Sequence, residues 1–192
     1  MRKITLDELR EMAQAAKGYI DKIYVHWSAG RYHQFFDDYH INVDADGSIY
    51  ASTEDLTELL AHTWHRNSRA IGICMAGCYG AEAHSGYNTD FGDYPPTQDQ
   101  IDGVAKVVAV LCEELDLPID YAHVKTHCEA AEEDDYGPST TCERWDLWYL
   151  LDAPLTDELK LGGQVIRGKA AWWQKIFESL KKMARTNGLQ WL

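Results

Sequence analysis

Apolar residues recur at helical spacing in three stretches of the chain. The first begins after Thr5, which is spaced from Glu8 as in a capping box, and stops at Gly18. Its apolar positions are Leu6, Leu9, Met12, Ala13 and Ala16. The second opens at Thr97 and carries a stripe of Ile101, Val104, Ala105, Val108, Leu111, Cys112 and Leu115. The third, at about 169–185, places Trp173, Phe177, Leu180 and Ala184 on one face. These patterns predict three amphipathic helices.

Strand-like segments lie between the predicted helices. Residues 23–27 and 70–77 are short apolar runs, typical of buried strands. Residues 39–50 alternate around turn residues at 45–48 and predict a hairpin, and 121–126 predict a short strand. Because strands and helices interleave, we expect an α/β protein. We treat 1–192 as one domain, with a core at about 19–152, an N-terminal helix at 1–18 and a helical extension at 153–192.

The remaining segments have weaker patterns. Residues 79–96 are rich in Gly, Tyr, Asn, Asp and Pro, and loops of this length usually belong to a site or its lid. Residues 56–60 predict a short helical turn. A polar segment follows His127 as far as Thr141.

Charge changes the picture in two ways. A formal net charge of −13 on 192 residues argues against a nucleic-acid partner. From residue 157 onward the net charge is instead +4. That basic segment predicts a solvated helix face, with contact to an anionic surface such as cell-wall polymer as the alternative. Seven Trp and eleven Tyr could line a saccharide or peptide groove, although we expect most of them in the core.

The cysteines and the chain start suggest a compartment. Five cysteines cannot all pair, and the first residues lead into a charged amphipathic stretch instead of an apolar leader. No run is long enough to cross a bilayer. We therefore expect synthesis in a reducing cytoplasm without a signal peptide, where thiols are core residues or ligands. Apolar periodicity assigns Cys74, Cys78 and Cys112 to the core.

Two histidines and one cysteine are candidate zinc ligands. His26 ends a predicted strand, His127 ends another, and Cys142 lies in a polar turn beside charged residues. Three protein ligands with a fourth open position are typical of catalytic zinc, whereas structural zinc usually has four. His123 would lie about 13 Å from His127 along a strand at 3.3 Å per residue, so we expect it to be structural. Cys128, adjacent to His127, ranks below Cys142.

At this point the sequence resembles a known family, the zinc-dependent N-acetylmuramoyl-L-alanine amidases of the phage-lysozyme and peptidoglycan-recognition type. The resemblance runs from about 26 to 150 and follows the family's order. It rests on the first ligand motif at 25–30, the hairpin at 39–50, the segment at 62–77, the helix start at Thr97-x-x-Gln100 and the second ligand region at 126–142.

The resemblance implies a central mixed, twisted β-sheet flanked by helices. It implies Zn²⁺ bound by His26, His127 and Cys142, catalytic help from Tyr39, and a cleft lined by His62 and Asn67. Other branches carry a glutamate in the central strand, where this chain has Cys74 and Ala76, so it resembles the tyrosine-using phage branch. That branch has a lysine two residues before the cysteine ligand. Thr140 occupies this position here, and Thr140, Arg144 or zinc alone would stabilise the oxyanion.

The implied activity is hydrolysis of the amide between N-acetylmuramic acid and L-alanine in peptidoglycan, by a monomer. A binding protein that holds muropeptides without cutting them is one alternative. Others are a cytosolic enzyme that recycles wall fragments and a secreted effector. The interpretation favoured here is a phage or prophage endolysin that reaches the wall through a holin-type pore. A thiol hydrolase using Cys142 or Cys128 with His127 is a further alternative.

Overall fold

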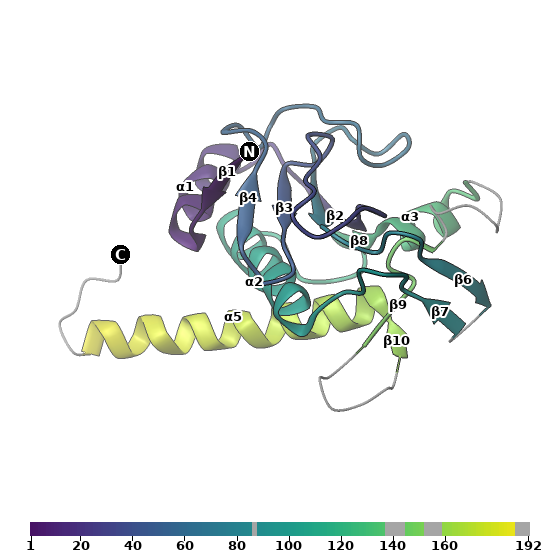
Figure 1. Cartoon of the computed structure of the whole chain (residues 1–192). Helices are drawn as coiled ribbons and strands as arrows, with labels where there is room; N and C mark the ends of the chain where they lie inside the picture. Colours follow the sequence, from purple (N-terminus) through teal and green to yellow (C-terminus); the bar gives the residue numbers. More distant parts are fainter. Residues whose placement is uncertain (86–87, 137–144, 152–158, 187–192) are drawn as a thin grey trace.

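The computed structural model describes residues 1–85, 88–136, 145–151 and 159–186. Its centre is a six-stranded mixed sheet in the order β1-β4-β3-β5-β2-β8 (Figure 1). Strands β2, β5 and β8 are parallel neighbours and β3 pairs parallel with β5, whereas β1 and β3 run antiparallel to β4. The strands are β1 (Arg2–Ile4), β2 (Lys22–Trp27), β3 (Ile41–Val43), β4 (Ile49–Ala51), β5 (Ala70–Met75) and β8 (Val124–Thr126). The predicted fold class is confirmed.

Continuous apolar sequence places β2 and β5 at the centre of the sheet. Every residue of β5 is buried, and in β2 only Lys22 is exposed. Strands covered on both faces read as apolar runs, whereas a strand with one wet face would alternate. Alternation of side chains then sends Ile23, Val25 and Trp27 into the main core, and Tyr24 into a second cluster on the opposite face with Ala70 and Ala130.

Helices cover both faces of the sheet. Helices α1 (Leu6–Ala16), α2 (Gln98–Glu114) and α5 (Gly162–Thr186) contribute to the main core, and α5 runs beneath α2 in Figure 1. The capping box predicted at Thr5 and Glu8 is present, and Thr97 caps α2. Helix α3 (His127–Glu133) supplies Ala130 to the smaller cluster on the other face. Within the described residues, no helix combines the length and apolar character that a membrane crossing requires.

Several local predictions need correction. The polar segment after His127 begins with α3, whose apolar side is only Cys128, Ala130 and Ala131, too short a stripe to be recognised by periodicity. The loop at 79–96 contains the hairpin strands β6 (Glu82–Ser85) and β7 (Asn88–Asp90). Residues 56–60 form a turn and bend, with no helix. Strands β1, β9 (Tyr149–Leu151) and β10 (Leu159–Leu161) have three residues each and were not predicted.

The basic extension differs from the predicted solvated face. Helix α5 begins at Gly162, seven residues before the predicted start. The prediction missed its first turn because that turn contains two glycines, which have low helix propensity. Three of its cations are paired inside the molecule: Arg167 with Glu129, Lys169 with Asp102 and Lys181 with Glu113. Much of the positive charge of this segment therefore holds α5 against α2 and α3.

Candidate metal centre

The two predicted histidine ligands meet at one edge of the sheet. His26 is the second-last residue of β2, and His127 is the first residue of α3, directly after β8. Because β2 and β8 are parallel neighbours, their carboxyl ends lie side by side. His26 points away from the main core, on the same face as Tyr24, and its side chain is fully buried. The ring centroids of His26 and His127 are 4.8 Å apart.

A third donor completes the group, and it is a carboxylate that the sequence did not suggest. Asp146 Oδ2 lies 3.2 Å from His26 Nδ1 and 3.1 Å from His127 Nδ1, and the two nitrogens are 3.1 Å apart. The three atoms thus form a nearly equilateral triangle. Among the described residues, this is the group of His, Cys, Asp or Glu side chains that could hold a metal ion.

The triangle has the dimensions of one face of a tetrahedral zinc site. Zinc bonds to histidine nitrogen and carboxylate oxygen are about 2.0–2.1 Å long, which places neighbouring ligand atoms of a tetrahedron about 3.3 Å apart. Two imidazoles and one carboxylate are also a ligand set found at catalytic zinc. The residues present therefore fit a divalent cation with one open position.

Hydrogen bonds to the backbone hold Asp146 in this orientation. The amide of Trp27 donates to Asp146 Oδ1 at 2.6 Å, which leaves Oδ2 facing the imidazoles. The amide of Cys128, in the first turn of α3, donates to the carbonyl of Asp146 at 3.0 Å. The aspartate is thus fixed both to the strand that carries His26 and to the helix that carries His127.

The second nitrogen of His26 is also occupied. Its Nε2 lies 3.2 Å from Thr63 Oγ1, which lies 2.9 Å from His62 Nδ1. When His26 Nε2 carries the proton, Thr63 Oγ1 accepts a hydrogen bond from it and donates one to His62 Nδ1. The lone pair of His26 Nδ1 is then available for a cation. Partners of this kind orient histidine ligands in metalloproteins.

Burial keeps the histidines near the site neutral. Loss of hydration lowers the pKa of His26, although Asp146 works in the opposite direction. Burial also lowers the pKa of His62 to about 2, with the neighbouring imidazoles adding to the effect. For Asp146, burial alone would raise the pKa, but contact with His127 and His26 holds it below the usual value. A neutral His26 beside an ionised Asp146 is the arrangement that metal binding requires of these two groups.

The remaining predicted residues lie at different distances from this group. The ring of Tyr39 is 5.0 Å from that of His26. His62 is buried and packs against Gly72, where a Cβ would lie 2.6 Å from its ring. Asn67 accepts hydrogen bonds from the amides of His62 and Thr63, so it shapes the loop that carries both. A contact between His62 or Asn67 and substrate remains a prediction.

Two predicted site residues, Cys142 and Thr140, lie outside the described residues. Cys128 is buried in α3, and Cys74, Cys78 and Cys112 are buried as the apolar periodicity predicts. Burial raises the pKa of the Cys74 thiol well above its ordinary value, which makes it a poor nucleophile. His123 contacts Asp120 with its Nδ1, at 2.7 Å, in keeping with the structural role predicted for it.

An aromatic surface borders the group on the side of α3. The rings of Trp64 and Tyr136 are stacked with centroids 5.3 Å apart, and Trp64 is 56% exposed. Together with His65, Arg66, Asp134 and Asp135 they line a surface pocket. Because Trp64 follows Thr63 directly, this pocket lies one residue along the chain from the contact with His26.

The model of the N-acetylmuramoyl-L-alanine amidase family, Amidase_2, matches residues 15–144, more than half of the chain. The chain belongs to this family. The match contains His26 and His127 and ends two residues before Asp146. Curated proteins give no match to the sequence.

Several solved structures are similar to part of the chain. The endolysin N-acetylmuramoyl-L-alanine amidase LysCS from Clostridium intestinale URNW is 17% identical, with a TM-score of 0.42 over 58% of this chain and 71% of that one. The amidase LysC from the same organism is 16% identical, with a TM-score of 0.40 over 58% and 72%. PGRP-Hd from Alvinella pompejana is 18% identical, with a TM-score of 0.39 over 65% and 76%.

Proposed function

We propose that this protein is a zinc-dependent N-acetylmuramoyl-L-alanine amidase that hydrolyses the amide between N-acetylmuramic acid and L-alanine in peptidoglycan. Family membership supports the reaction. The observation that carries the proposal is the triangle of His26 Nδ1, His127 Nδ1 and Asp146 Oδ2, with edges of 3.1–3.2 Å.

We assign Asp146 as the third ligand, in place of Cys142. Its carboxylate already lies against both histidines, and the backbone amide of Trp27 holds it there. The sequence adds a second argument. The phage branch that this chain resembles has a lysine two residues before its third ligand, and Arg144 is two residues before Asp146. With Asp146 as the ligand, a cation stands where the resemblance expects one, whereas the Cys142 alignment leaves Thr140 there.

The residues of the chain supply orientation and hydrogen bonds around the reacting amide. A zinc ion held by the three ligands would lower the pKa of a bound water to about 7 and polarise the scissile carbonyl. Tyr39 carries a phenol hydroxyl, which can donate a hydrogen bond, on a ring 5.0 Å from that of His26. His62, held neutral by burial, accepts from Thr63 and so keeps His26 oriented.

Metal stoichiometry of paired variants tests the assignment. Wild-type protein should bind one zinc per chain and release a peptide beginning with L-alanine from muropeptides, as detected by mass spectrometry. Asp146→Asn should lose zinc and activity, whereas Cys142→Ser should keep both. Zinc loss in Cys142→Ser with retention in Asp146→Asn would reverse the ligand assignment. Stoichiometric zinc without any product would favour a peptidoglycan-binding protein.

The biological setting is a separate proposal. Because the sequence resembles the tyrosine-using phage branch, we propose an endolysin that acts on the polymeric cell wall, as opposed to an enzyme that recycles soluble wall fragments. Purified protein should then release peptides from intact sacculi at least as readily as from soluble anhydro-muropeptides. A strong preference for the soluble fragments would assign the recycling role.

A further inference from the structure

We propose that the first turns of α5 position the metal ligands, with Arg167 as the positioning residue. This inference rests on the proposed zinc site. It concerns a segment beyond the family match, which ends at residue 144, and it gives the C-terminal helix a role in the chemistry.

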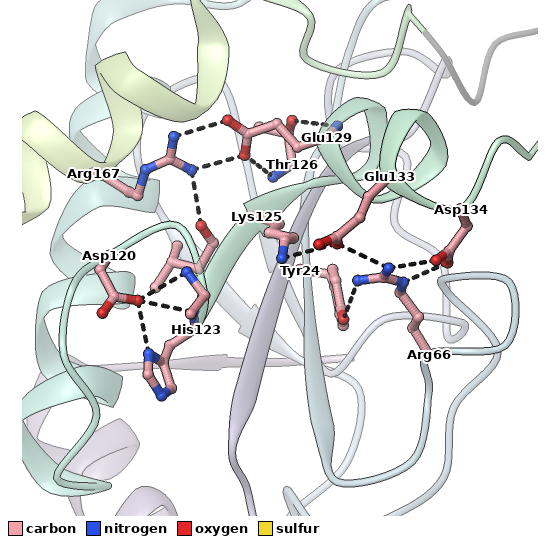
Figure 2. A network of polar contacts seen from close by, with 12 residues as sticks. Tyr24, Arg66, Asp120, His123, Lys125, Thr126, Glu129, Glu133, Asp134 and Arg167 are labelled. Atoms are coloured by element: carbon pink, nitrogen blue, oxygen red, sulfur yellow. Dashed lines mark hydrogen bonds and ion pairs between the residues drawn. The ribbon is translucent and has the colours of Figure 1, made fainter.

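Arg167 forms hydrogen bonds to the helix that begins with His127. Its Nη1 and Nη2 donate to the two carboxylate oxygens of Glu129 at 2.7 and 2.8 Å, and Nη1 also donates to the carbonyl of Val124 at 2.8 Å (Figure 2). One guanidinium therefore contacts the last strand before His127 and the first turn after it. The side chains of Arg167 and Glu129 are only 14% and 18% exposed. A forked, largely buried contact of this kind fixes direction as well as distance.

Glu129 transmits this hold to the start of α3. It is the third residue of the helix and forms a capping box with Thr126: the Thr126 amide donates to Glu129 Oε2, and the Glu129 amide donates to Thr126 Oγ1. His127 lies between these two residues. Figure 2 shows Arg167, Glu129 and Thr126 linked by these hydrogen bonds. The carboxylate that Arg167 contacts therefore fixes the backbone on both sides of a proposed ligand.

Two glycines let α5 approach the segments that carry two ligands. A Cβ at Gly163 would lie 2.2 Å from Glu129 Oε1, and one at Gly162 would lie 2.1 Å from the carbonyl oxygen of Leu147, the residue after Asp146. The Gly162 amide donates to the carbonyl of Trp148 at 2.8 Å. The first turn of α5 therefore touches both the turn that holds Asp146 and the helix that holds His127.

The same helix offers a matched control. Lys181 pairs with Glu113 of α2 at 2.7 Å, so its ion pair ties α5 to α2, whereas the ion pair of Arg167 ties α5 to α3. Replacing Arg167 or Lys181 by glutamine removes one positive charge and one ion pair from α5 in each case. If Arg167 contributed only to general stability, the two substitutions would affect zinc binding to a similar extent. If Arg167 positions the ligands, only Arg167→Gln should weaken zinc binding.

The experiment measures zinc affinity of the full-length chain by competition with a chromophoric chelator. Loss of a group hydrogen-bonded directly to a metal ligand typically lowers affinity about 10–100-fold. Arg167 acts through Glu129 and does not contact a ligand itself, so we expect a loss at the lower end of that range, about 10-fold, in Arg167→Gln. Arg167→Lys, which cannot make the two parallel hydrogen bonds, should lose less, and Lys181→Gln should change affinity by no more than about twofold. Cobalt(II) substituted for zinc should show an altered visible spectrum in Arg167→Gln only.

Each result decides the question. Unchanged affinity and cobalt spectrum in folded Arg167→Gln would overturn the positioning role while leaving the zinc site intact. Absence of zinc binding by the wild type would instead overturn the proposed function. Should Arg167→Gln fail to fold, Glu129→Gln provides the second test, because its amide oxygen can still accept from Thr126. Equal losses in Lys181→Gln would also contradict the proposal.

Discussion

Asp146 uses its two carboxylate oxygens for different neighbours. Oδ1 accepts from the backbone of β2 at Trp27, and Oδ2 faces the two imidazoles. Burying a carboxylate is energetically costly unless it is paired, and these contacts give both oxygens of Asp146 a partner. This division explains how a side chain from a turn can complete a site whose other members lie on a strand and a helix.

Tyr39 offers the first test of chemistry at this site. Tyr39→Phe removes the hydroxyl and keeps the ring beside His26, so zinc content should be unchanged. Loss of one hydrogen-bond donor to a developing oxyanion typically lowers kcat about 10²–10³-fold. We expect that range for muropeptide cleavage, measured by chromatography of the products. Tyr50→Phe, in the stacked pair with Phe35, is the control. An unchanged kcat in Tyr39→Phe would remove this residue from the mechanism.

His40 should make the protein sensitive to acid. Its Nε2 donates to the carbonyl of Glu58 and its Nδ1 accepts from the amide of Gly72, so the folded ring is neutral, and burial lowers its pKa. The unfolded ring takes up a proton near pH 6.5. The stabilising effect is therefore complete above that pH and is lost as the pH falls below it, by up to about 1.4 kcal/mol per pH unit.

Urea unfolding at pH 7.5 and 5.5 measures this effect. Wild type should lose more free energy of unfolding between the two values than His40→Gln, which has no titrating ring at this position. Buried His62 acts in the same direction and remains in both proteins. The same loss in both proteins would show that His40 is not the source.

Helix α2 is joined to the sheet by one buried amide. Gln100 Nε2 donates to the carbonyls of Val43 and Ala76, each at 2.9 Å, where β3 and β5 end. Val43 also accepts from the Ala76 amide, so it would keep a partner without Gln100. Gln100→Met should leave the Ala76 carbonyl poorly satisfied and lower the free energy of unfolding by about 1–3 kcal/mol.

Chemical denaturation of Gln100→Met and of Gln164→Met tests this link. Gln164 is exposed on α5, so its replacement should change stability by no more than about 0.5 kcal/mol. Equal stabilities of the two variants would mean that the amide contributes nothing to holding α2.

The elements that the sequence predicted are those with many apolar positions. Strands β2 and β5 were marked by continuous apolar runs and helices α1 and α2 by helical periodicity, and the structure contains all four. Helix α3 was hidden because three small or short side chains form its buried face. The start of α5 was hidden because Gly162 and Gly163 serve close approach, which only the folded neighbours reveal.

At the site, the sequence led to His26 and His127 but not to Asp146. Histidines are few, and both follow strand-like runs, whereas the chain has 31 acidic residues. No motif or spacing in the sequence places one of them beside the two imidazoles. The clue available was its setting, between Trp145 and Leu147, where a charge without a partner would be unfavourable.

The proposed metal joins three distant parts of the molecule, so its removal should destabilise the whole fold. His26 comes from β2, His127 from α3 and Asp146 from the turn before β9. A ligand present at about 100 times its Kd adds about 2.7 kcal/mol. For a chain of this size that corresponds to a rise in Tm of about 5–10 °C.

Thermal unfolding with chelator and with added zinc measures this effect. Zinc should restore the Tm of chelator-treated wild type, and Asp146→Asn should show one low Tm in both conditions. A chelator effect of equal size in that variant would place the stabilising metal elsewhere.

The dependence on Arg167 has a consequence during translation. Of the described helices, α5 is the last to leave the ribosome. A nascent chain still lacking it would already contain every proposed zinc-binding side chain, yet the Glu129 carboxylate in the first turn of α3 would lack its Arg167 partner. The proposed amidase would then bind zinc tightly only after α5 has been synthesised.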